Sequence, residues 1–294
     1  GFAALICMKF RIGPDMGVVM VKAIALSLIS VLVLLPAMAL VSYRLIDRTQ
    51  HRPLLPEFGK FAGLVFKIRV PAMILFLLII TPAFLAQGDN DFRYGAGDMF
   101  GKGTQVYEDR IKVESTFGKT NQMVMMVPRG DTAKEKELSD AIYEIPQVTN
   151  VISYVDTAGA EVPIEYLDED TLSQLVSEHY SRMVISVSTE AEGKDAFSVV
   201  EKLRQLGKKY YGGEYLLAGD SVSTYDMREV TTSDMQVVNF IAIGAIFLIL
   251  LLTMRSLSIP VVLVLVIETA VWMNLSVPYF TGEHLQYIAY LIIS

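Results

Sequence analysis

Cysteine and histidine are almost absent from this chain of 294 residues. Cys7 is the only cysteine, so the chain forms no intrachain disulfide. The three histidines, His51, His179 and His284, do not have the short sequence spacings of a metal-ligand set. The sequence therefore predicts neither a disulfide framework nor a metal site.

Basic residues are also under-represented, with 25 Lys and Arg against 32 Asp and Glu, a formal net charge of −7. Nucleic-acid-binding surfaces are rich in Lys and Arg, so this balance argues against a nucleic-acid partner. The sequence has no G-x-S-x-G nucleophile motif and no histidine placed to serve a nucleophile. We expect no catalytic residue and no cofactor, and therefore no enzyme.

An initiator methionine and a signal peptide are missing from the start of the chain. Residues 1–6 have the composition of the end of an apolar segment, and residues 287–294 that of the beginning of another. We expect both termini of this sequence to lie within membrane spans, so that the chain is an internal fragment.

Long apolar runs are what the sequence has in excess. It is 52% hydrophobic and 19% charged, whereas an average soluble domain is about 45–50% apolar and about 25% charged. A helix needs about 20 mostly apolar residues to cross a bilayer. Four runs satisfy or approach that length and predict spans at residues 18–41, 70–86, 236–254 and 257–280.

Basic residues between the first two spans orient the chain, because short cytoplasmic loops are enriched in Lys and Arg. Only Asp47 and Glu57 oppose them within residues 42–70, and Arg255 lies in the turn between the last two spans. Both segments are predicted to be cytoplasmic, which places residues 87–234 outside the cytoplasm of a multi-pass plasma (cell) membrane protein. The basic residues of the first segment are Arg44, Arg48, Arg52, Lys60, Lys67 and Arg69.

The predicted organisation has five segments. Apolar residues of the second segment recur at helical spacing between basic ones, which predicts an amphipathic helix on the membrane surface; they are Leu54, Leu55, Phe58, Phe61, Ala62, Val65 and Phe66. The segments are transmembrane 1–41, cytoplasmic amphipathic linker 42–69, transmembrane 70–86, extracytoplasmic α+β domain 87–234 and transmembrane 235–294.

The α+β domain is predicted to contain two β-α-β halves separated by a polar insertion, which is the split βαβ or ferredoxin-like pattern. Residues 220–234 are polar and predicted to be helical, continuous with the span that begins at residue 236. The other expected elements are a helix (103–117), a strand (122–127), a helix (132–144), a strand (148–154), an acidic helix (168–178), a strand (183–188), a helix (194–210) and a strand (215–218).

The order of these segments, together with three short motifs, resembles MMPL-type transporters of the resistance–nodulation–division superfamily. The motifs are Ile12-Gly13-Pro14-Asp15-Met16-Gly17, Phe117-Gly118-Lys119-Thr120-Asn121 and Ile267-Glu268-Thr269-Ala270-Val271-Trp272-Met273-Asn274-Leu275. The resemblance implies a polytopic α-helical membrane protein with twelve spans, of which this chain holds about spans five to ten, and a porter-type α+β domain outside the membrane.

The resemblance also implies function. Such proteins use the proton-motive force to export lipids, other hydrophobic molecules or drugs. The implied partners are the lipid bilayer, a hydrophobic or lipid substrate and the missing half of the same polypeptide, with a homo-oligomer left open. The proton-relay Asp residues of the family lie in spans outside this chain, so the resemblance assigns no relay residue here.

Three polar residues within the spans are the candidate site. Glu268 lies near the middle of an apolar run, where an ionisable group is costly and normally faces the bundle interior or water. It either tunes a proton or substrate pathway or makes a structural hydrogen bond between helices. Asn239 and Asn274 can also form hydrogen bonds between helices, and for them we favour that structural role.

Two alternative functions fit the same architecture. A non-transporting lipid or sterol sensor, or a membrane scaffold, would lack acidic residues in the central spans. The permease of an ATP-driven exporter can also carry an outer domain between two spans, but it would need a separate ATPase and a cytoplasmic coupling helix.

Overall fold

The computed structural model describes residues 2–49, 59–90, 92–95, 100–162 and 169–289. The chain divides into two compact units. Gly1–Phe92 and Val230–Ser294 form one, called here the helical unit, and Arg93–Glu229 form the other, called here the α+β unit.

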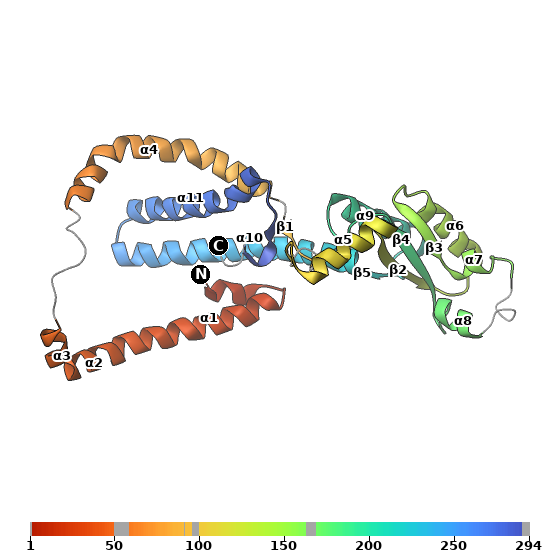
Figure 1. Ribbon diagram of the computed structural model, residues 1–294, viewed down its shortest axis with the longest axis horizontal. Helices are drawn as coiled ribbons and strands as arrows, with labels where there is room; N and C mark the ends of the chain where they lie inside the picture. Colours follow the sequence, from red (N-terminus) through yellow and green to blue (C-terminus); the bar gives the residue numbers. More distant parts are fainter. Residues whose placement is uncertain (1, 50–58, 91, 96–99, 163–168, 290–294) are drawn as a thin grey trace. The chain divides into compact units, whose positions relative to one another are not determined.

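The helical unit consists of long apolar helices (Figure 1). Among the described residues, four helical stretches are long and apolar enough to cross a membrane: Ile12–Val41, Gly63–Gly88, Asp220–Met254 and Ser258–Thr281. The four predicted spans are therefore confirmed as helices of sufficient length. The elements of this unit are η1 (Phe2–Cys7), α1 (Ile12–Ile29), the π-helical turn η2 (Ser30–Leu34), α2 (Leu35–Val41), α3 (Tyr43–Arg48), α4 (Gly59–Gly88), the part of α10 (Asp220–Met254) from Val230 onward, and α11 (Ser258–Thr281).

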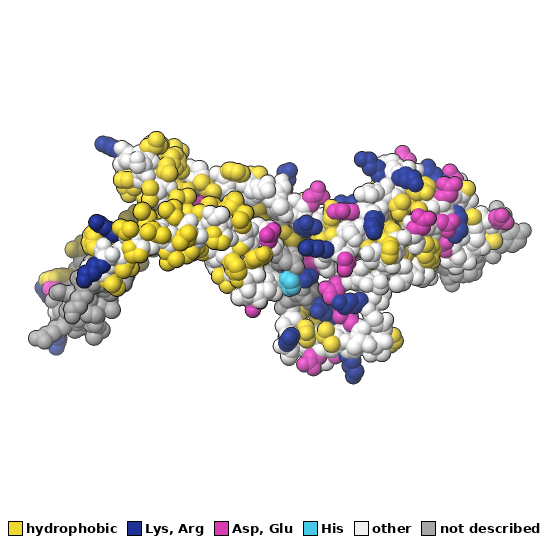
Figure 2. All heavy atoms as spheres, turned by 90° about the horizontal axis from the view of Figure 1, so that it is seen from above, with side chains coloured by type: hydrophobic (Ala, Val, Ile, Leu, Met, Phe, Trp, Pro, Cys, Tyr) yellow, Lys and Arg dark blue, Asp and Glu magenta, His cyan; other side chains and the backbone are white. Residues whose placement is uncertain are grey.

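The surface of these helices is apolar. Leu40 is 76% exposed and Leu252 is 70% exposed, and many neighbouring Leu, Val and Ile side chains are also exposed. Figure 2 shows hydrophobic side chains gathered over the helical unit, whereas Lys, Arg, Asp and Glu gather over the α+β unit. Exposed apolar area costs about 25 cal/mol per Å² in water, so this surface is suited to the lipid of a bilayer.

Two helix boundaries differ from the sequence prediction. The first span begins at Ile12 rather than at residue 18, because Pro14 lies in the first helical turn, where its missing N–H has no intrahelical partner to lose. At the predicted division between the linker (42–69) and the span (70–86) no helix ends, since α4 is one helix that continues through Pro71 and Pro82. Each proline removes a single helical hydrogen bond, which does not end this helix.

Part of the predicted amphipathic linker lies outside the described residues. Leu54, Leu55 and Phe58 are not described, and Val65 and Phe66 belong to α4, where both are exposed. The span predicted to begin near residue 287 also continues into residues 290–294, which are not described.

The α+β unit is built around a four-stranded sheet with the order β3-β4-β2-β5. All three neighbouring pairs are antiparallel, so β4 lies between β2 and β3, which run parallel to each other. The elements are α5 (Gln105–Phe117), β2 (Asn121–Pro128), α6 (Thr132–Tyr143), β3 (Val148–Ile152), α7 (Tyr154–Thr157), α8 (Glu169–Leu175), β4 (Tyr180–Val187), α9 (Lys194–Tyr211) and β5 (Leu216–Gly219). Two short strands, β1 (Phe92–Arg93) and β6 (Leu285–Gln286), form a separate two-stranded sheet.

Alternation of buried and less buried side chains along β2 and β4 defines the core of this unit. Successive side chains of a strand point to opposite faces, so every second residue of both strands reaches the same layer. Helices α6 and α9 cover that layer with their own apolar faces. The core comprises Met123, Met125, Val127, Met183, Ile185 and Val187 from the strands and Leu138, Ile142, Val199, Val200 and Leu203 from the helices.

Gly219 at the end of β5 is the most constrained glycine of the sheet. Its φ is +143°, and a Cβ there would lie 2.8 Å from the Gln122 carbonyl oxygen and 3.1 Å from the Met123 Cα. Both neighbours are backbone atoms of the central strand, so they cannot move aside without breaking the ladder between β2 and β5. A residue without a side chain is therefore required where β5 passes into α10.

We predict that Gly219→Ala lowers the unfolding free energy of the α+β unit by about 2–4 kcal/mol, since it adds steric overlap to backbone strain. Gly212→Ala is the matched control, because Gly212 also has a positive φ but its added Cβ would meet no atom within 4 Å. Native-state hydrogen exchange of the Met125 amide measures both changes. Equal losses of stability in the two variants would contradict the steric argument.

Candidate functional site

Glu268 lies on the covered side of α11. Val264, Glu268 and Trp272 are half-buried and Leu275 is buried. These positions recur at intervals of four, four and three residues, which is the spacing of one helix face. The carboxyl group is therefore part of the face by which α11 packs within the helical unit.

Helix α4 is the neighbour of this face (Figure 1). The rings of Phe84 and Trp272 meet edge to face with centroids 5.0 Å apart. Two residues beyond the end of α4, Asn90 Nδ2 donates a hydrogen bond to the carbonyl oxygen of Leu275, further along α11. Residue numbers increase in the same direction in both segments from the first contact to the second, so α4 and α11 run parallel.

The parallel register places an apolar stretch of α4 opposite Glu268. Glu268 lies one helical turn before Trp272, and the corresponding turn before Phe84 contains Ile79 and Ile80, both half-buried. In contrast, the next residue of α11, Thr269, is fully buried, and its hydroxyl donates to the Leu265 carbonyl 2.7 Å away. Glu268 is thus level with the turn of α4 that contains these two half-buried aliphatic side chains.

The other two candidate residues do not join Glu268. Asn274 is exposed, six residues further along α11 and on a different side of that helix. Asn239 is half-buried on α10, next to Val238, which packs with Ala4, Leu5 and Met8 of the N-terminal segment. The structure therefore places Glu268 and Asn274 on different sides of α11 and Asn239 on α10.

Asp234 is a buried polar residue that sequence reasoning missed. It is 3% exposed, and its Oδ2 accepts a hydrogen bond from the Phe10 backbone N–H at 2.8 Å. The Phe10 ring also meets the ring of Tyr287 edge to face. An acidic residue at the start of the apolar part of α10 is the only signal the sequence offers, and it does not reveal the partner 224 residues away.

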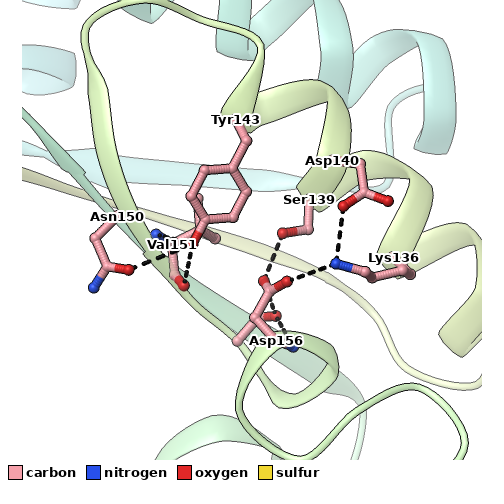
Figure 3. A network of polar contacts seen from close by, with 8 residues as sticks. Lys136, Ser139, Asp140, Tyr143, Asn150, Val151 and Asp156 are labelled. Atoms are coloured by element: carbon pink, nitrogen blue, oxygen red, sulfur yellow. Dashed lines mark hydrogen bonds and ion pairs between the residues drawn. The ribbon is translucent and has the colours of Figure 1, made fainter.

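A polar network connects α6 and α7 in the α+β unit (Figure 3). Asp156 accepts hydrogen bonds from the hydroxyls of Ser139 (2.5 Å) and Ser153 (2.7 Å), and its other oxygen lies 3.1 Å from Lys136 Nζ. Lys136 also pairs with Asp140 at 2.8 Å. The Asp156 side chain is only 11% exposed, so this network fixes α7 against α6 through nearly buried bonds.

Glu135, which lies on α6, is buried, with only 3% of its surface exposed. Its Oε1 is one of the buried polar atoms that have no hydrogen-bond partner among the described residues. Burial raises the pKa of the Glu135 carboxyl above its ordinary value of 4.5; a hydrogen bond with Ser181 lowers it, and the nearby charge of Asp156 raises it further. Burial also raises the pKa of Tyr211 to about 12, with the negative charges of Glu135 and Asp131 adding to the effect.

Metal binding has no support in the part of the chain that the structure describes. Among those residues, no three His, Cys, Asp or Glu side chains are grouped closely enough to hold a metal ion. Cys7 is a free, exposed cysteine.

Four apolar helices of spanning length and a separate α+β unit define a polytopic membrane protein. Comparison with protein families gives a match to the MMPL family over residues 98–290, which is more than half of the chain. The chain belongs to the MMPL family of resistance–nodulation–division-type transporters, as the sequence motifs predicted. A comparison with curated proteins found no match.

We predict that the α+β unit becomes less stable as pH rises, because the folded state holds a proton on Glu135 that the unfolded state releases near pH 4.5. The stability contributed by the protonated carboxyl begins to be lost near pH 4.5, and the loss is complete above the raised pKa of Glu135 in the folded state. Glu135→Gln removes the charge and should flatten this part of the stability profile. Thermal unfolding of the full-length protein between pH 4 and 8 measures this pH dependence of stability.

Glu137→Gln is the matched control, since Glu137 is exposed two residues further along α6. It should leave the pH profile unchanged. A wild-type profile that is flat from pH 4 to 8, or one that Glu135→Gln does not alter, would contradict the prediction.

Proposed function

We propose that this chain is part of a secondary transporter, driven by the proton-motive force, that exports lipids, other hydrophobic molecules or drugs. Membership of the MMPL family supports transport, and the apolar helix surfaces support a substrate that enters from the bilayer. The protein would act by changing conformation rather than by covalent chemistry on its substrate, and so would not be an enzyme.

The observation that carries the proton coupling is the position of Glu268 on the packed face of α11. An ionised carboxylate in the middle of a span costs about 2.5–3.5 kcal/mol on insertion scales. Uptake of a proton by the carboxylate removes that charge, and its release restores it. Each step would change the free energy of packing α11 against the aliphatic face of α4, which couples a proton to helix movement.

The α+β unit is proposed to be a ferredoxin-like, porter-type domain outside the cytoplasm. Its strand order supports this, because β4 separates β2 and β3 as the split βαβ pattern requires. The orientation rests on the basic residues of segment 42–69, which includes the first part of α4, and on Arg255 in the turn between α10 and α11. The proposed location is the plasma membrane, with the remainder of the same polypeptide, the bilayer and a homo-oligomer as partners.

We predict that Glu268→Gln in the full-length protein lowers proton-driven export by at least about tenfold, a change of about 1.4 kcal/mol in a rate barrier. Glu268→Asp keeps the titratable group and should retain more activity. Proteoliposomes with an imposed pH gradient provide the assay, with a fluorescent phospholipid analogue and an uncharged hydrophobic dye as probes.

Glu283→Gln, at an exposed position just beyond α11, is the control and should transport normally. Membrane levels of all variants are measured in parallel. If Glu268→Gln exports both probes at the wild-type rate, Glu268 is a structural residue and the coupling proposal fails.

We also predict the orientation of the chain. In a background with Cys7→Ser and any other cysteines replaced, Ser115→Cys on α5 should react with a membrane-impermeant maleimide in intact cells. Ser258→Cys, at the first residue of α11, should react only after the membrane is permeabilised. The reverse labelling pattern would overturn the proposed topology.

A further inference from the structure

Residues 189–193, in the loop between β4 and α9, contact both chain segments that connect the α+β unit to the rest of the protein. It is called here the clamp loop. One segment is the entering chain at Tyr94 and Gly95, and the other is the leaving chain at the start of α10. All of these residues belong to the α+β unit.

Glu192 of the clamp loop holds the entering chain. Its Oε1 accepts a hydrogen bond from the Tyr94 backbone N–H at 2.6 Å, and its Oε2 accepts one from the Gly95 N–H at 3.0 Å. Both carboxylate oxygens are therefore used on consecutive amides. Such charge-assisted bonds are roughly twice as strong as neutral ones.

Buried polar groups hold the leaving chain to the same loop. The Ser221 hydroxyl, on α10, donates to the Ala191 carbonyl at 2.6 Å and accepts from Asn121 Nδ2 at 2.6 Å. Asn121 Nδ2 also lies 3.2 Å from the Glu190 carbonyl. Ser221 is fully buried and Asn121 is 6% exposed, so water has little access to these bonds.

The first turns of α10 have further attachments to α9. Val222 is part of the core cluster of the α+β unit. Asp226 pairs with Arg204, and the Tyr225 ring meets the ring of Phe197 edge to face at 5.6 Å. The start of α10 is thus integrated into the packed domain.

The two attachments differ in kind. The leaving helix is fixed by hydrogen bonds among the buried side chains of Ser221 and Asn121 and by the core. On the entering side the Tyr94 side chain is also buried, at 7% exposure, but the carboxylate of Glu192, which accepts the two backbone hydrogen bonds, belongs to a half-exposed residue. Water can compete for the hydrogen bonds from the Tyr94 and Gly95 amides to Glu192, so these bonds open at lower free-energy cost than the buried ones. Gly95 also approaches α10 closely, since a Cβ on it would lie 3.6 Å from Thr224 Oγ1.

We propose that the clamp loop is a releasable joint: during transport the bonds from Tyr94 and Gly95 to Glu192 open and close, while Ser221 and the start of α10 stay fixed to the sheet. This inference rests on the proposed transport function. It assigns Glu192 a positioning role, because it acts by placing the entering chain and touches no substrate.

Hydrogen exchange in the native full-length protein tests the opening without any transport assay. We expect the amides of Tyr94 and Gly95 to exchange at least about tenfold faster than the helical amides at residues 225–228 of α10. Glu192→Ala should accelerate exchange at 94 and 95 alone. Glu190→Ala, which removes the exposed partner of Lys119, should not. Equal protection of the two segments in the wild type would overturn the proposal.

A reversible cross-link tests whether opening is needed for transport. Gly95→Cys with Thr224→Cys, in the cysteine-free background, places two thiols across the clamp. Oxidation should lower export by at least about tenfold, and a reductant should restore it. The control pair is Gln122→Cys with Ser186→Cys, which are directly opposite on β2 and β4 and should cross-link without effect.

The outcomes separate this inference from the proposed function. Full export by the oxidised clamp pair would overturn the joint while leaving the transporter intact. If the wild-type protein exports neither probe, the proposed function fails, and the exchange rates at residues 94, 95 and 225–228 still decide whether the clamp opens.

Discussion

The large apolar surface of the long helices is the constraint on which the rest of this structure depends. Side chains such as Leu40 and Leu252 lie mostly exposed in the described chain, and only a lipid environment removes that area from water at no cost. Within such an environment a backbone or side-chain polar group without a partner is penalised by several kcal/mol. Polar residues in the helical unit are therefore few, and where each one lies carries functional information.

Three of those residues make hydrogen bonds to backbone groups of the helical unit. Thr269 bonds to its own helix, Asn90 reaches the backbone of α11, and Asp234 accepts an amide from the N-terminal segment. Glu268 differs because the neighbouring turn of α4 is aliphatic. The bonds of Asn90 and Asp234 connect segments that are distant in sequence, so they position the helices, whereas a titratable group set against an aliphatic face can alter how those helices pack.

The spans and the two β-α-β halves were predictable because each depends on local periodicity. Apolar length defined the spans, and alternation along Asn121–Pro128 and Tyr180–Val187 defined the strands. The continuity of α4 past residue 69 was not predictable in this way, because proline disfavours helix interiors only on average, and α4 accommodates Pro71. The candidate residues Glu268, Asn239 and Asn274 were found by their polarity alone. Whether they meet depends on helix packing, and the bonds of Asp234 and Glu192 join residues about 100 or more positions apart, which no local pattern encodes.

The sheet order has a consequence for biosynthesis. The central strand β2 is made first, yet its two neighbours are β4 and β5, so the sheet stays open until the last strand has been synthesised. That strand ends at Gly219, and α10 begins at the next residue. Closure of the α+β unit and insertion of the following span therefore fall in the same short interval of translation. Until then the apolar strand faces of the partly made domain are exposed, and such faces are prone to aggregation.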